Sequence, residues 1–224
     1  MASGRDRKSG WDRSRIFLLA ECIVLFFIVP AGLYAHRHWF AWRITPIVLV
    51  IAAICGAYLI TDKSFDKRKL WSAKNVSCHV RKIILTFVLP AATVGSLTYF
   101  YQKELFLYFV SAEPWLWVVF VLLYPLLAVY PQELVFRAFF FHRYRNLFPD
   151  SFTLILFNGI SFGIAHLFYA NWFAPLLSTF GGMLFAYRYA KTDSLLAASI
   201  EHGLWGNFLF TIGLGWYFYS GSIP

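Results

Sequence analysis

Charged residues are scarce in this chain of 224 residues, where Asp, Glu, Lys and Arg together make up 14%. Soluble domains carry about 25% charged and about 45–50% apolar residues, whereas 59% of this chain is hydrophobic. A soluble domain of this size cannot bury so much apolar surface in one core. The composition therefore excludes a soluble globular fold and intrinsic disorder, and it predicts an all-α, polytopic integral membrane protein.

Cysteine is also rare, and the chain lacks the local metal-binding motifs. Its three cysteines are far apart, and neither a Cys-x-x-Cys pair nor a His-Glu-x-x-His motif occurs. These absences exclude a disulfide scaffold and the commonest zinc-binding spacings. The net charge of +9 could suggest nucleic acid, but the basic residues lie between apolar runs. We therefore expect the lipid bilayer, and no nucleic acid, as a partner.

Seven apolar runs have about the length that a membrane-spanning helix needs, which is about 20 residues. They cover residues 16–35, 44–60, 83–101, 115–141, 152–168, 173–190 and 194–214. The fourth run is too long for one straight span and contains Pro125 and Pro131, so it predicts either two helices or one kinked helix. We expect a bundle of seven to eight transmembrane helices.

The basic residues predict how the chain is oriented and divided. Alternate connections, counted from the N-terminus, hold 17 of the 20 Lys and Arg residues. By the positive-inside rule this places the N-terminus in the cytoplasm and the C-terminus outside, in what we expect to be a bacterial inner membrane. We divide the chain into a basic cytoplasmic tail (1–15), three spans (16–110) with a basic cytoplasmic loop (61–82), a core (111–215) and an extracytoplasmic tail (216–224).

Ionisable residues inside apolar runs point to the functional part of the chain. Each costs about 2.5–3.5 kcal/mol at the centre of a membrane helix, and residues 130–210 hold most of them. Glu133 and Arg137 are four residues apart, so they share a helix face and can pair. These costly residues predict that the function lies in the second half of the chain, with the first three spans as scaffold.

A second group of polar residues lies on the following run. Asn158, Phe162 and His166 are spaced four apart, which places them on one face of a helix. If residues 132–147 and 151–168 form an antiparallel hairpin, Glu133 and His166 lie equally far from its turn. The spacing therefore predicts one site that contains both side chains.

The last run adds Glu201, His202 and Asn207. Adjacent residues point about 100° apart on a helix, so Glu201 faces either an arginine of a neighbouring helix or the cavity. A glutamate with two histidines suits two chemistries, namely water activation by a carboxylate base and a His₂-carboxylate metal site. The spacing does not separate them.

Taken together, these motifs resemble the CPBP intramembrane proteases, also called the CAAX-processing or abortive-infection family. The family pattern is Glu-Glu-x-x-x-Arg, then Phe-x-x-x-His, then His-x-x-x-Asn or Asp, on successive helices. The chain carries its counterparts in the same order within about residues 115–215: Gln132, Glu133 and Arg137, then Phe162 and His166, then His202 with Asn207.

The resemblance implies a glutamic-type endopeptidase that cleaves a membrane-associated protein or peptide. Glu133 would activate water, Arg137 would hold Glu133, and His166, His202 and Asn207 would stabilise the tetrahedral intermediate. Substrate-binding roles are expected for Gln132, Phe162 and Asn158. No cofactor is expected; a zinc-dependent variant would use Glu133, His166 and His202.

Two departures from the family pattern leave an alternative open. Gln132 replaces the first glutamate, which is usually taken as the base, and Gly206 stands where the pattern has Asn, so that Asn207 comes one residue late. The alternative is a catalytically inactive relative that acts as a membrane binding or immunity protein. A small transporter is a third hypothesis, which the absence of an inverted repeat disfavours.

Overall fold

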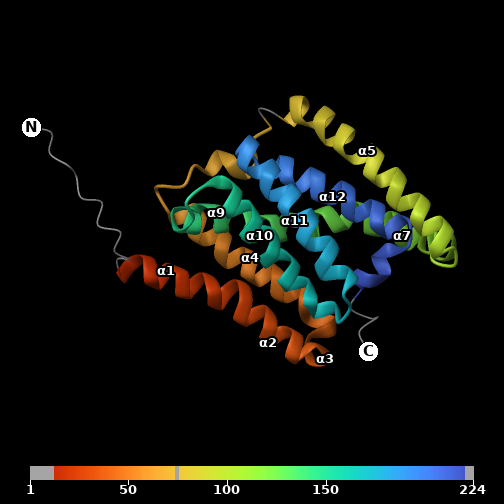
Figure 1. The fold of residues 1–224 in the computed structure, drawn as a ribbon, viewed down its shortest axis with the longest axis horizontal. Helices are drawn as coiled ribbons and strands as arrows, with labels where there is room; N and C mark the ends of the chain where they lie inside the picture. The colour runs from red at the N-terminus through yellow and green to blue at the C-terminus, as the bar shows by residue number, and fades with distance from the viewer. Residues whose placement is uncertain (1–12, 74–75, 220–224) are drawn as a thin grey trace, which may run out of the picture.

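The computed structural model describes residues 13–73 and 76–219 (Figure 1). All regular elements in these ranges are helices, and no strand occurs among them. The all-α class is therefore confirmed. Most of the predicted N-terminal tail and the last five residues of the predicted C-terminal tail lie outside the described residues.

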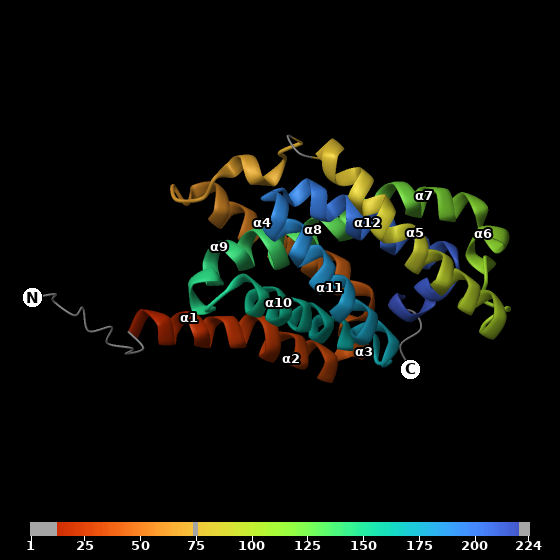
Figure 2. The same cartoon turned by 45° about the horizontal axis from the view of Figure 1, so that its top comes forward.

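The first two predicted spans form a pair of long helical segments joined by short turns. The first consists of α1 (Arg13–Ile23), a π-helical turn η1 (Val24–Ile28) and α2 (Val29–Ala35), and the return consists of α3 (Arg37–Phe40), η2 (Ala41–Arg43) and α4 (Ile44–Thr61). In Figures 1 and 2 the α1–α2 segment runs along the edge of the bundle, beside α10.

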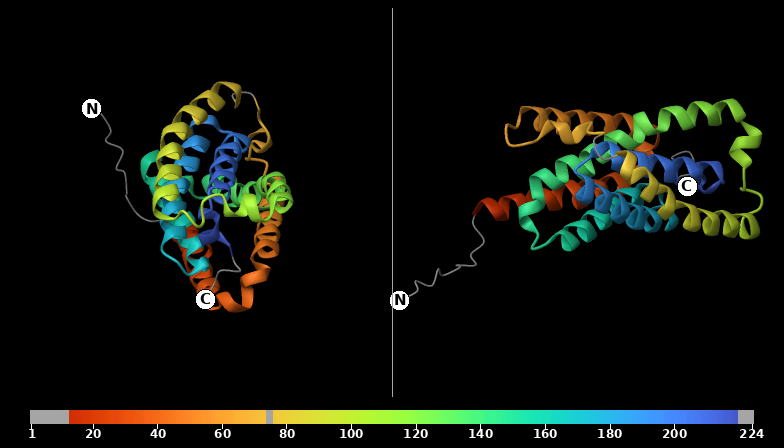
Figure 3. Two further views of the ribbon diagram at one scale, coloured as in Figure 1. Left: turned by 90° about the vertical axis from the view of Figure 1, so that its right-hand side faces the viewer. Right: turned by 90° about the horizontal axis from the view of Figure 1, so that it is seen from above.

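The third span, α5 (Val76–Tyr101), follows a loop that contains η3 (Lys67–Leu70). It lies on the outside of the bundle, where it packs against α12 (Figure 3). A short α6 (Tyr108–Ala112) then leads back into the bundle. Large apolar side chains such as Leu89 and Phe100 are exposed on α5, as expected of a helix that faces lipid.

The fourth run is one long helical segment, Pro114–Leu147, of 34 residues. Its parts are α7 (Pro114–Tyr124), η4 (Pro125–Val129), α8 (Tyr130–Glu133), η5 (Leu134–Phe139), α9 (Phe140–Tyr144) and η6 (Arg145–Leu147). Of the two predicted alternatives, the single irregular helix is confirmed. The irregularity has a cause, because proline lacks a backbone N–H and disturbs the turn around it. Both η4 and η5 are π-helical turns, and they flank Gln132 and Glu133.

The remaining helices complete the core: α10 (Ser151–Ala165), η7 (His166–Tyr169), α11 (Phe173–Thr192), α12 (Leu195–Thr211) and η8 (Leu214–Phe218). The Asp150 side chain caps α10 by accepting a hydrogen bond from the Thr153 N–H at 2.8 Å, which lowers the pKa of Asp150. Glycines let α10 and α11 pack closely, since a Cβ atom on Gly163 would lie only 2.7 Å from the Pro175 carbonyl oxygen.

Five described helical segments are long and apolar enough to cross a membrane, which agrees with an integral membrane protein. They are Arg13–Ala35, Arg37–Thr61, His79–Tyr101, Pro114–Leu147 and Ser151–Tyr169. The sixth and seventh predicted spans are helical too, as α11 and α12, but they are not among the five. α12 is short for a membrane span, with 17 residues, and α11 is less apolar near its end, where it carries Arg188 and Lys191.

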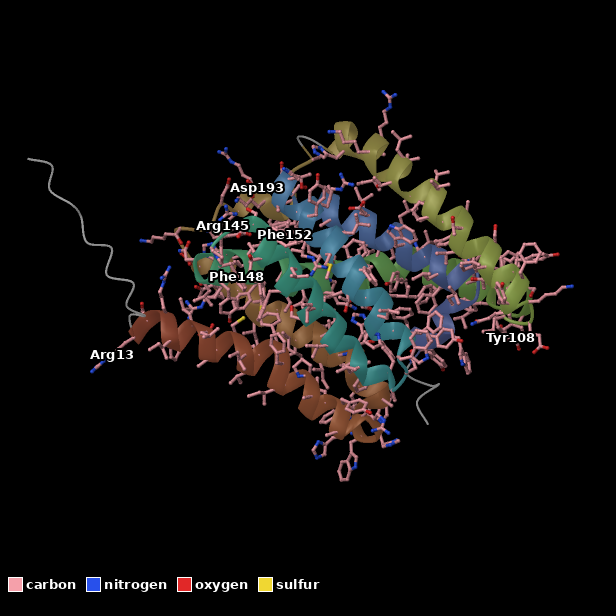
Figure 4. The ribbon with its side chains drawn as sticks, viewed as in Figure 1. Arg13, Tyr108, Arg145, Phe148, Phe152 and Asp193 are labelled. Carbon is pink, nitrogen blue, oxygen red and sulfur yellow. The ribbon has the colours of Figure 1, made fainter. Side chains whose placement is uncertain are left out.

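The connections predicted to share the cytoplasmic side do lie together. Three hydrogen bonds join them: Arg15 to the Asn146 carbonyl at 3.1 Å, Lys69 to Asp193 at 2.8 Å, and Ser194 to the Ser72 carbonyl at 2.7 Å. In Figure 4, Arg13, Arg145 and Asp193 lie toward one side of the molecule and Tyr108 at the opposite end. The helices therefore alternate in direction as predicted, while which end faces the cytoplasm stays a prediction.

Candidate active site

Glu133 lies at the centre of a buried polar cluster in the bundle. Its side chain is 0% exposed. One carboxylate oxygen, Oε1, is 2.9 Å from Nδ1 of His202, and the other, Oε2, is 3.1 Å from Nε of Arg137. A fully buried carboxylate needs such partners, because removal from water costs several kcal/mol per ion. Glu133 is therefore held from both sides, by one residue of its own helix and by one of α12.

Arg137 is fixed in turn by α10. Its Nη1 donates to Oδ1 of Asn158 at 3.0 Å, while Nδ2 of Asn158 donates to the Phe136 carbonyl at 2.6 Å. The guanidinium also lies 4.8 Å from the centre of the Phe162 ring, a cation–π geometry. Asn158 thus supports Arg137 from a fully buried position, and it is not among the residues that line the cavity described below.

The predicted hairpin and its register are confirmed. Phe136 meets Phe162 with ring centres 5.0 Å apart, and Phe140 meets Phe157 at 6.2 Å. Residues that pair across the hairpin are therefore nearly equidistant from the turn near residue 149. The same register brings His166 level with the pair at positions 132 and 133.

His202 joins the carboxylate to a cavity of about 400 Å³. Its ring stacks on Phe185, with centres 4.6 Å apart and planes 13° apart, and meets the edge of Phe162 at 5.5 Å. A carboxylate accepts hydrogen bonds only, so Nδ1 of His202 donates to Glu133. In the neutral ring Nε2 is then left as an acceptor, which makes His202 a histidine oriented by a buried carboxylate at the cavity wall.

His166 lines the same cavity from η7. Its Nδ1 is 2.8 Å from the Phe162 carbonyl oxygen. Because that oxygen only accepts, Nδ1 carries the proton, and Nε2 of the neutral ring is again an acceptor. The structure therefore brings the two predicted histidines to one cavity, each oriented through Nδ1.

Gln132 also lines cavities beside His166, on the side toward α4. Its Oε1 is buried and makes no hydrogen bond within the described part of the chain. The amide therefore occupies a cavity-lining position, whereas the neighbouring Glu133 is completely buried. The sequence alone did not show which of these two adjacent side chains lines a cavity and which is buried.

Asn207 does not join this cavity. Its Nδ2 donates to the Val121 carbonyl at 3.2 Å, and it is not among the cavity-lining residues. Relative to the family pattern, the shift of one residue turns this side chain by about 100° around the helix, and the catalytic role of Asn207 stays a prediction.

Tyr124 is a cavity residue that the sequence analysis missed. It lies against Gly206, and a Cβ atom built on that glycine would overlap the Tyr124 ring and hydroxyl. Tyr124 lines the cavity together with His166 and His202. The available signal was the glycine one turn after His202, which leaves room for a large side chain from a neighbouring helix.

Glu201, adjacent to His202, faces an arginine, which settles an alternative that the sequence left open. Arg188 of α11 donates from Nε and Nη2 to its two oxygens, both at 2.9 Å. Such a bidentate pair is strong and directional. It joins α11 to α12 beside the site without supplying a group to the cavity.

The alternative zinc ligands do not converge. Among the side chains that the structure describes, no three His, Cys, Asp or Glu residues gather closely enough to hold a metal ion. Glu133 and His202 are in contact, but His166 lies outside their group. The residues present therefore do not fit a His₂-carboxylate centre.

Part of the chain matches the model of a known protein family. Residues 114–209 match the family described as Rce1-like, type II CAAX prenyl endopeptidase. The match confirms the resemblance indicated by the motifs, over the segment that carries all three of them. No curated protein and no solved structure matches the chain.

Proposed function

We propose, from the match of residues 114–209 to the Rce1-like endopeptidases, that this protein is an intramembrane peptidase that cleaves a membrane-associated protein or peptide. The observation that carries the proposal is the pairing of buried Glu133 with His202 at the wall of a cavity shared with His166. A carboxylate that orients an imidazole toward an open space is an arrangement suited to proton transfer.

In this proposal Glu133 acts through His202. Both Glu133 oxygens already face partners and the side chain is 0% exposed, so a water in the cavity would meet Nε2 of His202 instead. That nitrogen takes a proton from the water, and the carboxylate stabilises the imidazolium that forms. The water oxygen bonds to the scissile carbonyl carbon, whose oxygen becomes negatively charged.

The second half of the reaction returns the proton. As the tetrahedral intermediate collapses, the C–N bond breaks and Nε2 of His202 gives its proton to the leaving amine. Nε2 of His166, at the same cavity, accepts a hydrogen bond from the attacking water and helps to orient it. Arg137 balances the charge of the Glu133 carboxylate through their buried ion pair. These steps need no metal ion.

The test compares membrane-protein fragments in cells that make the wild type or Glu133→Gln at equal abundance. New N-termini should appear with the wild type and fall by about 10²–10⁴-fold in the variant, which is the usual contribution of acid–base catalysis. Glu201→Gln is the matched control, because that carboxylate is equally buried and paired with an arginine. Cleavage that survives Glu133→Gln would refute the proposed role of the pair.

A second candidate is a catalytically inactive binding protein, and Gln132 favours it. The family pattern has a glutamate there, and the structure has an uncharged amide lining a cavity. Under this hypothesis the wild type cleaves no peptide bond, and the Gln132→Glu variant gains cleavage activity. Cleavage by the wild type would refute the hypothesis of an inactive binding protein.

A further inference from the structure

We propose that the hydroxyl of Tyr124 donates the hydrogen bond that stabilises the oxyanion of the tetrahedral intermediate. This inference rests on the proposed function, and it names a catalytic residue that no sequence motif contains. Four features of the structure support it: the place of Tyr124 in the cavity, the glycine behind it, the rigidity of its ring and the freedom of its hydroxyl.

Tyr124 stands next to the groups that would handle the proton. It lines the cavity that both histidines line, and it also lines the adjoining cavity that contains Gln132 and His166. Its ring centre is 6.4 Å from that of His202, with the planes nearly perpendicular at 83°. A scissile carbonyl that is attacked by a water bound to His202 therefore lies close to the Tyr124 hydroxyl.

Gly206 makes this approach possible. It lies four residues after His202, on the same face of α12, and any side chain there would occupy the space of the Tyr124 ring. Gly203 imposes no such requirement, because a Cβ atom there would lie 3.7 Å from Pro125, an ordinary van der Waals contact. The absence of a side chain at Gly206 thus lets the long helix bring a tyrosine beside the imidazole.

The Tyr124 ring is held firmly by other aromatic side chains. It stacks on Phe120 at 5.0 Å with planes 18° apart, and Phe210 lies at 5.7 Å. It also ends α7, directly before Pro125 and the π-helical turn. A donor fixed in advance costs no reorganisation when negative charge develops in the reaction, which is the requirement for effective oxyanion stabilisation.

The hydroxyl is available as a donor. No hydrogen bond joins it to another described residue, and the nearby carboxylate of Glu133 and imidazole of His202 are paired with each other. A phenol is neutral near pH 7, so it donates without a proton transfer. The oxyanion accepts this hydrogen bond, and no bond to Tyr124 forms or breaks.

The test is Tyr124→Phe, assayed in nanodiscs with a fluorogenic peptide that spans a cleavage site identified in the membrane-fragment comparison. The kcat should fall by about 10²–10³-fold, the usual cost of removing one oxyanion donor, while KM stays within about twofold of the wild-type value. Tyr130→Phe is the matched control, because that hydroxyl donates to the Leu70 carbonyl, outside the cavity. It should leave kcat unchanged.

A rescue experiment separates a donor from a packing residue. In Tyr124→Ala the ring is gone, and adding Gly206→Asn places an amide one turn after His202, in the space that the ring had filled. We expect kcat to rise at least tenfold over Tyr124→Ala. Gly206→Asn alone should lower kcat, because its side chain displaces the Tyr124 ring.

The outcomes distinguish this inference from the function on which it rests. An active wild type with an equally active Tyr124→Phe variant overturns the inference and leaves the peptidase proposal standing. A wild type that cleaves nothing overturns both. A loss of kcat in Tyr124→Phe that comes with an equal loss in Tyr130→Phe also overturns the inference, since both losses would then reflect packing.

Discussion

The buried ion pair between Glu133 and Arg137 makes a quantitative prediction about stability. Both side chains are 0% exposed and their charged atoms lie 3.1 Å apart. Replacing Arg137 with Met removes one charge and leaves the other buried, which costs about 3–5 kcal/mol. The variant Glu133→Gln leaves Arg137 with a neutral partner and should cost a similar amount. In the double variant no charge remains unpaired, so its cost should be smaller than the sum of the two by at least about 2 kcal/mol.

The assay is reversible unfolding of the four proteins in mixed micelles, followed by tryptophan fluorescence. A second cycle on the pair Lys69 and Asp193 gives the control, because those side chains lie 2.8 Å apart but are 34% and 68% exposed. Exposed pairs contribute about 0–1 kcal/mol, so that cycle should be additive within error. Additive losses at Glu133 and Arg137 as well would refute the argument that the two charges depend on each other.

Three further predictions follow from other contacts. Gly163→Val should destabilise the protein by about 1–3 kcal/mol, measured by the same unfolding assay, because its side chain would press on the Pro175 carbonyl; an unchanged midpoint would show that α10 and α11 can separate at no cost. His142 hydrogen-bonds Asp62 at 2.9 Å and holds the pKa of that carboxyl below its usual range. The stabilisation from the ionised Asp62 is therefore fully present above its unfolded pKa of about 3.9 and is lost as the pH falls through the lowered folded value. Asp62→Asn should therefore reduce the loss in free energy of unfolding between neutral and acidic pH. The same loss in the variant as in the wild type would contradict this. Phe185→Leu removes the ring that stacks on the His202 imidazole at 4.6 Å. It should lower kcat about tenfold, because the imidazole is then held less firmly. An unchanged kcat would show that Phe185 only fills space.

The class of the molecule and much of its helical layout could be predicted from the amino-acid sequence. Scarce charge and seven apolar runs were enough to predict an all-helical membrane protein, because the bilayer requires long apolar helices. The spacing of residues around Pro149 and Asp150 was enough to predict the hairpin, since the helical rise per residue is constant. The same geometry predicted that Glu133 and His166 lie level with each other.

Which side chains meet in the cavity could be seen only once the helices were placed in three dimensions. Gln132 and Glu133 are adjacent, and the π-helical turns on either side of them change the local helical register, so no regular helix predicts that Glu133 is buried and Gln132 lines a cavity. The neighbouring helices likewise turn Asn207 toward the Val121 carbonyl and bring Tyr124 against Gly206. Contacts between residues far apart in the chain depend on how helices pack, and one sequence does not specify that packing by spacing alone.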